Sequence, residues 1–136
     1  AMLDLDHFKR VNDGLGHAAG DEALRRVARA VDAELRGGDG FGRLGGEEFV
    51  AVLTETDPLG AAGTAERLRR GIEALDLDAV AAGLRVTVSV GLAVWRPGDD
   101  AASLLARADR ALYAAKGAGR NRVAWGGHRE PAAASA

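Results

Sequence analysis

Hydrophobic residues recur every three or four positions in three segments of the chain, and this spacing predicts three amphipathic helices. The predicted helices run from Asp21 to about Leu35, from Asp57 to about Leu75, and from Asp99 or Asp100 to Gly117. Pro58 follows Asp57, and an aspartate with a proline directly after it is a typical helix start. Glycines follow the first and third helices, as is common at the carboxyl ends of helices.

Five shorter segments are apolar or alternate between apolar and polar residues, which predicts strands. Gly45-Gly46 predicts a hairpin between the second and third strands, because tight hairpin turns need positive φ at their central residues. Asn12–Gly20 contains three glycines and few apolar residues, and is predicted to be a turn. The predicted strands are Ala1–Phe8, Gly40–Leu44, Glu47–Leu53, Arg85–Val94 and Val123–Trp125.

The predicted order of elements is β-α-β-β-α-β-α-β, and its first six members match the ferredoxin-like split βαββαβ unit. The predicted fold class is therefore α+β, with a largely antiparallel sheet and helices packed on it. We expect one domain over residues 1–126 and a flexible, alanine-rich tail over residues 127–136.

The composition is that of an ordinary globular domain. Of 136 residues, 47% are hydrophobic and 28% are charged, while aromatic residues make up only 4%, so Ala, Val and Leu are expected to form the core. The absence of cysteine excludes disulfides, thiolate metal sites and cysteine nucleophiles. A net charge of −2 argues against a nucleic-acid polymer as partner, and no apolar run is long enough to span a membrane. We expect a cytoplasmic protein without membrane contact.

Two pairs of acidic residues occur at predicted strand ends, Asp4 and Asp6 in the first strand and Glu47-Glu48 after the hairpin turn. The first strand of a split βαββαβ sheet lies beside the hairpin, so these carboxylates are expected to converge at one edge. Carboxylates without His or Cys suit Mg²⁺, which takes oxygen ligands, waters and substrate phosphates. Solvated surface acids near turns are the alternative for Asp4 and Asp6 alone. An EF-hand calcium loop starting at Asp4 is excluded, because its third ligand and its glycine are missing.

Three further groups of polar residues stand out, and two of them have both a functional and a structural interpretation. Asn12 and Asp21 could accept hydrogen bonds from guanine and disfavour adenine, or serve as a turn residue and a helix cap. Lys116 and Arg120 could hold phosphate oxygens, or complement the dipole of the last helix. For Arg36–Asp39, the residues alone favour a short-range ion pair or a helix-end feature.

Five motifs follow one another along the chain. They are Asp4–Asp13 (DLDHFKRVND), Gly16–Asp21 (GHAAGD), Arg43–Phe49 (RLGGEEF), Val86–Gly91 (VTVSVG) and Ala108–Asn121 (ADRALYAAKGAGRN). Together they cover nearly everything from Met2 to Trp125, and they closely resemble the GGDEF family of diguanylate cyclases. The resemblance implies a palm-like nucleotidyl cyclase fold. It also implies an enzyme that joins two GTP molecules into cyclic di-GMP across a symmetric homodimer, with release of two pyrophosphates.

The resemblance also implies roles for individual residues. Asp4, Glu47 and the backbone carbonyl of Leu5 are the implied ligands of Mg²⁺, for which Mn²⁺ could substitute. Glu47 or Glu48 is implied in activating the attacking hydroxyl, and Arg36 with Asp39 in product inhibition by cyclic di-GMP. The implied GTP contacts are Phe8, Lys9, Asn12, His17, Asp21, Gly45, Gly46, Lys116 and Arg120.

The sequence departs from the family at its amino end. Family members carry a helix and a Leu-Thr-Gly-Leu-x-Asn-Arg segment before the first strand, so we expect an N-terminally truncated output domain. A non-catalytic receptor for cyclic di-GMP or GTP is the alternative function, and the intact Gly-Gly-Glu-Glu-Phe motif favours the enzyme. An adenylyl or guanylyl cyclase is disfavoured, because Asn12 and Asp21 match guanine-reading positions.

Overall fold

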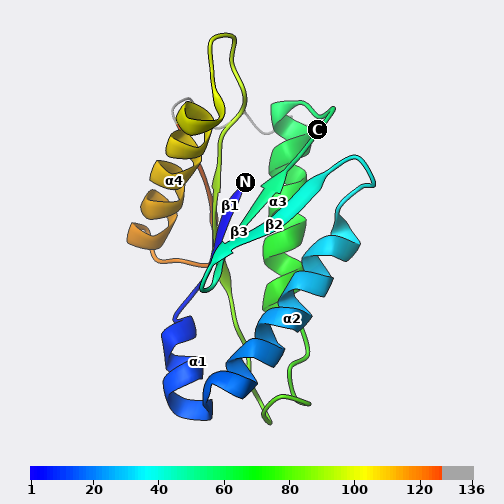
Figure 1. The fold of residues 1–136 in the computed structure, drawn as a ribbon, viewed down its shortest axis with the longest axis vertical. Coiled ribbons are helices and arrows are strands. Elements are labelled where there is room, and N and C mark those ends of the chain that lie inside the picture. The colour runs from blue at the N-terminus through cyan, green and yellow to red at the C-terminus, as the bar shows by residue number, and fades with distance from the viewer. Residues whose placement is uncertain (127–136) are drawn as a thin grey trace, which may run out of the picture.

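The computed structural model describes residues 1–126, which form five strands and four helices (Figure 1). The predicted tail, residues 127–136, lies outside the described residues. In chain order the elements are β1 (Met2–Leu5), α1 (Phe8–Leu15), α2 (His17–Glu34), β2 (Gly40–Gly45), β3 (Glu48–Val52), α3 (Pro58–Glu73), β4 (Val88–Leu92), α4 (Ala101–Gly117) and β5 (Val123–Trp125).

All five strands form one sheet in the order β2-β3-β1-β4-β5. Every neighbouring pair is antiparallel except β4 and β5, which run parallel. The central strand β1 is buried throughout, and Asp4 lies opposite Glu48 of β3 and Ser89 of β4. This arrangement confirms the predicted α+β fold, with the first strand beside the hairpin.

Helices cover both faces of the sheet. Figure 1 shows α4 on one side, with α2 and α3 on the other. Leu3 and Leu5 belong to the main core on the α2 and α3 side, whereas Met2 packs against Leu112 of α4. Since successive side chains of a strand point to opposite faces, Asp4 faces α4 like Met2. The backbone of α4 approaches the sheet so closely that a Cβ at Gly91 would lie 2.1 Å from the carbonyl oxygen of Ala108.

The segment between β1 and α2 differs from its prediction. The first strand ends at Leu5 rather than Phe8, and the predicted turn over Asn12–Gly20 is helical except at Gly16. Buried Phe8 and Val11 give α1 an apolar face, so this glycine-rich segment folds as a helix by packing. The break falls at Gly16, whose φ of 87° is disfavoured for other residues.

Two strand predictions also need correction. The hairpin turns at Gly46 and Glu47 instead of Gly45-Gly46, because Gly45 still pairs with Glu48. The strand β4 is shorter than the predicted Arg85–Val94, since its partner β1 has only four residues and ends where the chain enters α1.

The predicted starts of α3 and α4 are confirmed. The carboxylate of Asp57 accepts a hydrogen bond from the Gly60 amide at 2.6 Å, and Asp100 forms a reciprocal capping box with Ser103. No helix in residues 1–126 combines the length and apolar character needed to cross a membrane.

Candidate active site

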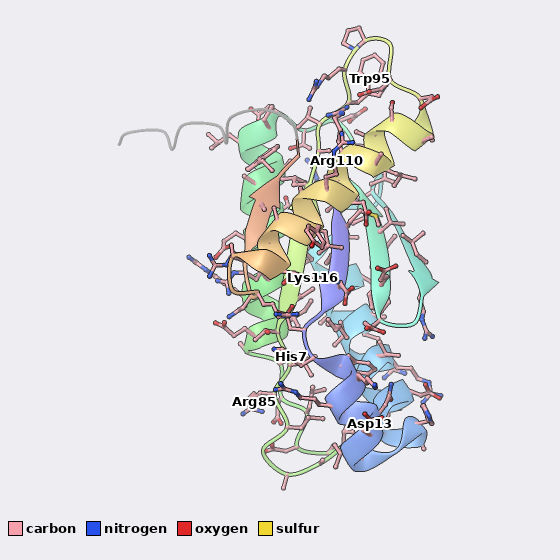
Figure 2. The ribbon with its side chains drawn as sticks, turned by 90° about the vertical axis from the view of Figure 1, so that its left-hand side faces the viewer. His7, Asp13, Arg85, Trp95, Arg110 and Lys116 are labelled. Carbon is pink, nitrogen blue, oxygen red and sulfur yellow. The ribbon has the colours of Figure 1, made fainter. Side chains whose placement is uncertain are left out.

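A pocket of about 170 Å³ lies where β1 ends and α1 begins. Figure 2 shows Lys116, at the end of α4, above His7 and the first turn of α1, while Trp95 lies at the top of the view. The pocket joins β1, α1, the hairpin turn and the end of α4. Its lining consists of Asp4, Leu5, Asp6, His7, Phe8, Lys9, Glu47, Lys116 and Arg120.

Asp4 is a nearly buried acid of this pocket, and it forms an ion pair with Lys116. Its side chain is only 8% exposed, and its Oδ2 accepts a hydrogen bond from the Lys116 ammonium at 2.5 Å. The two residues are 112 positions apart in the chain. The pairing depends on α4 crossing the sheet to reach the end of β1.

Glu47 reaches the pocket from the hairpin turn. Its backbone carbonyl accepts a hydrogen bond from the Leu5 amide at 3.2 Å, which ties the turn to the end of β1. Glu48 lies opposite Asp4 in the sheet but does not line the pocket. Within residues 1–126, neither glutamate carboxylate has a hydrogen-bond partner. Both therefore remain available to a ligand.

Asp6 lines the same pocket as Asp4 and Glu47, as the sequence led us to expect, but its carboxylate already has partners within the fold. Its carboxylate is buried and already accepts three hydrogen bonds, from the hydroxyls of Thr87 and Ser89 at 2.7 Å and from the Asn121 amide at 3.0 Å. A carboxylate satisfied in this way holds the fold together. In the described part of the chain, no three His, Cys, Asp or Glu side chains form a metal-binding group.

The cationic side of the pocket comes from α1 and the end of α4. No acidic residue or side-chain cap occupies the first turn of α1, so the amides of Phe8 and Lys9 and the positive end of the helix dipole are open to an anion. His7 precedes them with a φ of 54°. Lys116 lies in the last turn of α4, so the alternative role for it as complement of the helix dipole is compatible with its place in the pocket.

Arg120 lies in a turn of unusual geometry. Gly119, Arg120 and Asn121 all have positive φ, of 124°, 66° and 46°. The Asn121 amide donates to Asp6, and its side chain bonds to Arg69 and to Glu73 of α3. The sequence did not predict these contacts of Asn121, although asparagine is one of the residues that tolerate positive φ.

The predicted base-reading residues lie beside a second pocket. Asp21 lines a hollow of about 490 Å³ between α2 and the hairpin, together with Leu24, Arg25, Ala28, Phe41, Gly42, Arg43 and Phe49. Asn12 lies against α2 at Gly20, where a Cβ would come within 1.9 Å of the Asn12 Oδ1. Gly20 thus brings the Asn12 amide next to the turn of helix that carries Asp21.

The structural alternatives for these two residues are wrong. Asn12 is helical, and Asp21 lies in the second turn of α2, because the helix begins at His17 with Gly16 at its cap. His17, Gly45 and Gly46 line neither of the two pockets.

Arg36 and Asp39 form a turn after α2 that is bonded to Thr54. The Asp39 carboxylate accepts from the backbone amides of Thr54 at 2.9 Å and Arg36 at 3.0 Å, and the Arg36 guanidinium donates to the Thr54 carbonyl at 3.1 Å. The Thr54 amide, followed by the Arg36 amide, lowers the pKa of Asp39 below its ordinary value. The turn keeps an exposed guanidinium beside an ionised carboxylate.

Comparisons with known proteins agree with this geometry. The family model described as diguanylate cyclase, GGDEF domain, matches residues 1–122. The chain is 41% identical over 123 residues to diguanylate cyclase A of Treponema denticola and 42% identical over 123 residues to diguanylate cyclase DgcP of Pseudomonas aeruginosa. Both matches cover 90% of this chain but only 33% and 18% of those proteins.

Solved structures give the same result. The active GGEEF domain of a diguanylate cyclase from Vibrio cholerae has a TM-score of 0.86 at 32% identity, covering 94% of this chain and 81% of that one. The GGDEF domain of DgcB from Caulobacter crescentus, solved with c-di-GMP, has a TM-score of 0.84 at 36% identity, covering 91% and 74%. The chain therefore belongs to the GGDEF domain family of diguanylate cyclases.

Proposed function

We propose that this domain is a diguanylate cyclase that condenses two GTP molecules into cyclic di-GMP and releases two pyrophosphates. The observation that carries the proposal is the pocket at the end of β1, where acids face cations. Asp4 and Glu47 lie on the acidic side, while Lys9, Lys116 and Arg120 supply positive charge. A metal-dependent reaction of a nucleoside triphosphate needs both.

The donors at the pocket fit a hard divalent cation. The carboxylates of Asp4 and Glu47 and the backbone carbonyl of Leu5 are all oxygen donors, and such a small set leaves room for waters and phosphate oxygens, as Mg²⁺ requires. We propose that these three groups hold Mg²⁺ or Mn²⁺. When bound, the ion supplies charge neutralisation at the reacting phosphate.

The remaining residues of the pocket bind and orient the triphosphate. The open amides of Phe8 and Lys9 at the start of α1, together with the side chains of Lys9, Lys116 and Arg120, are suited to phosphate oxygens. The 3′-hydroxyl oxygen of one GTP attacks the α-phosphorus of the other, and the bond to pyrophosphate breaks. Glu47 or Glu48 takes the hydroxyl proton, since both carboxylates are open.

Base recognition falls to Asn12 and Asp21. Their amide and carboxylate oxygens would accept from the ring N–H and the exocyclic amine of guanine, which adenine cannot satisfy in the same way. The proposed GTP contacts of His17, Gly45 and Gly46 rest on the family resemblance alone, because none of the three lines either pocket.

Two GTP molecules must face one another for this reaction, so the proposal requires a homodimer in which each domain presents one nucleotide. We further propose that cyclic di-GMP inhibits the enzyme by binding at Arg36 and Asp39. The exposed guanidinium can bind a phosphate or guanine, and the carboxylate can accept from guanine N–H groups. The substrate is the cellular nucleotide GTP, and we place the reaction in the cytoplasm.

Incubation of the 136-residue chain with GTP and Mg²⁺ at high protein concentration, followed by chromatography, tests the proposal. Cyclic di-GMP and pyrophosphate are expected in a 1:2 ratio by the stoichiometry of the reaction. Binding of GTP or cyclic di-GMP without turnover, at every protein concentration, would instead identify a receptor.

A further inference from the structure

Lys116 bonds to a residue that the proposed function assigns to the metal. Its ammonium donates to Oδ2 of Asp4 at 2.5 Å, and the carboxylate it covers is 8% exposed. Lys116 itself is 32% exposed and reaches Asp4 from the last turn of α4 (Figure 2). The pocket thus contains an ion pair where the proposed function needs a metal ligand.

An ammonium and a divalent cation compete for the same carboxylate oxygen. Within residues 1–126 no third acidic side chain joins Asp4 and Glu47 in a metal-binding group, so Lys116 neutralises one of the two carboxylates proposed to hold the metal. The other acid of the pocket, Asp6, is occupied by three hydrogen bonds and offers no substitute. A free divalent cation therefore meets a site whose attraction Lys116 has already reduced.

We infer that Lys116 is the internal counter-ion of Asp4 in the nucleotide-free protein and keeps free divalent cations from binding there. The inference rests on the proposed function, in which the triphosphate of GTP offers the ammonium a second anionic partner. The flexible four-carbon stem of lysine allows the ammonium to move from Asp4 to a phosphate oxygen. Asp4 is then released only when nucleotide is present, so cation and nucleotide bind cooperatively.

Lys9 provides a matched control, because it lines the same pocket and carries the same charge. It is exposed, and within the described residues its ammonium has no ion pair. Removal of Lys9 lowers the net charge of the pocket by one unit, as removal of Lys116 does. Only the Lys116 substitution also uncovers the Asp4 carboxylate.

A titration of the nucleotide-free 136-residue chain with Mn²⁺ tests the inference. The electron paramagnetic resonance signal of free Mn²⁺ measures how much of the ion is bound. We expect Lys116→Met to tighten Mn²⁺ binding at least ~10-fold, because a unit charge within a few ångströms of the site has been removed. Lys9→Met should tighten it by less than ~3-fold, since an exposed charge is screened. Lys116→Arg, which keeps the charge, should not tighten Mn²⁺ binding. Adding Asp4→Asn to Lys116→Met should abolish the gain in Mn²⁺ affinity that Lys116→Met gives alone.

Unchanged or weaker Mn²⁺ binding in both Lys116→Met and Lys116→Gln, with thermal melts like that of the wild type, would overturn the inference. An equal gain in Lys9→Met would also overturn it, since a contact with Asp4 would then be unnecessary. Calorimetry of GTP binding with Mg²⁺ tests the proposed function separately. If the wild-type chain binds no GTP, the proposed function fails whatever the Mn²⁺ titrations show.

Discussion

At the scale of single residues, an open carboxylate in the pocket, that of Glu47, and a second one beside it, that of Glu48, distinguish this site from an ordinary surface cleft. The side chains of Glu47 and Glu48 have no partner within residues 1–126, whereas Asp4 and Asp6, the other acids that line the pocket, are both bonded. An unpartnered carboxylate at the end of a tight turn adds nothing evident to stability, which agrees with the proposed role of these glutamates in ligand binding and chemistry.

Glu47→Gln and Glu48→Gln are therefore expected to abolish cyclisation without unfolding the domain. An amide has nearly the shape of a carboxylate, but it carries no charge for Mg²⁺ and accepts no proton. The rate should fall by at least ~10²-fold, on the scale of removing one preorganised electrostatic group. Product formation and thermal melts of each variant measure the two effects, and near-normal turnover in either variant would assign the chemistry elsewhere.

Asp21→Ala tests base recognition. Asp21 is exposed and caps no helix, so the variant should melt like the wild type while it binds GTP more weakly. The preference for GTP over ATP should narrow by at least ~10-fold, because the carboxylate no longer penalises the wrong base edge. Competition binding with both nucleotides gives the ratio. An unchanged ratio would exclude Asp21 from base recognition.

At the scale of elements, the close approach of α1 to α2 is what joins Asn12 to Asp21. Gly20→Ala would place a methyl group within 1.9 Å of the Asn12 Oδ1, and the flexible amide should move aside at little cost in stability. We expect weaker GTP binding with a small change in thermal midpoint. Gly71→Ala in α3 is the control, because its Cβ meets nothing within 4 Å and should stabilise the helix by about 0.5–1 kcal/mol.

The start of α4 predicts a dependence of stability on pH. The Ser103 amide lowers the pKa of Asp100, and the Arg96 amide lowers the pKa of Asp99. A carboxyl group whose pKa is lowered in the folded state stabilises the fold when the pH is above its ordinary pKa of 3.8. This contribution is lost as the pH falls through the lower pKa of the folded state. The midpoint difference between wild type and Asp100→Asn should therefore shrink below about pH 4. A constant difference between pH 3 and pH 6 would contradict this.

Elements with a regular apolar period or a strong cap could be predicted from the sequence, while elements formed by packing could not. Asp57 and Asp100 identified the starts of α3 and α4 because an N-cap bond is local. The helix α1 was missed because its stability comes from Phe8 and Val11 packing on the core, whereas the three glycines of Asn12–Gly20 predicted a turn. The length of β4 likewise depends on its partner β1, which lies far away in the chain.

At the scale of the whole molecule, the pocket combines the two ends of the domain with the hairpin between them. The convergence of Asp4 with Glu47 could be predicted, because the split βαββαβ topology places the first strand beside the hairpin. The three hydrogen bonds to the Asp6 carboxylate could not be predicted, because their donors lie in and just before β4 and in the turn after α4. Spacing along a strand gives the direction of a side chain but not its partners.

The proposed inhibition by cyclic di-GMP concerns a second region of the molecule, the turn that carries Arg36 and Asp39. The turn of Arg36 and Asp39 should survive Arg36→Ala, because the Asp39 carboxylate still accepts from two backbone amides. The concentration of cyclic di-GMP needed for half-inhibition should rise at least ~10-fold, since a charge-assisted contact is lost. Arg29→Ala, at an exposed arginine of α2, is the control. Equal shifts in both variants would remove Arg36 from the inhibitory site.

The 112-residue separation of Asp4 and Lys116 has a consequence for synthesis of the chain. Within this domain the ribosome makes β1 before α4, so no nascent chain that ends before Lys116 contains both halves of the pocket. Loops this long close slowly, and the pocket should be among the last features to form during folding. Nucleotide then stabilises only chains in which α4 has already been made. Limited proteolysis of translation intermediates should show protection by GTP and Mg²⁺ beginning only once residues up to Arg120 have emerged.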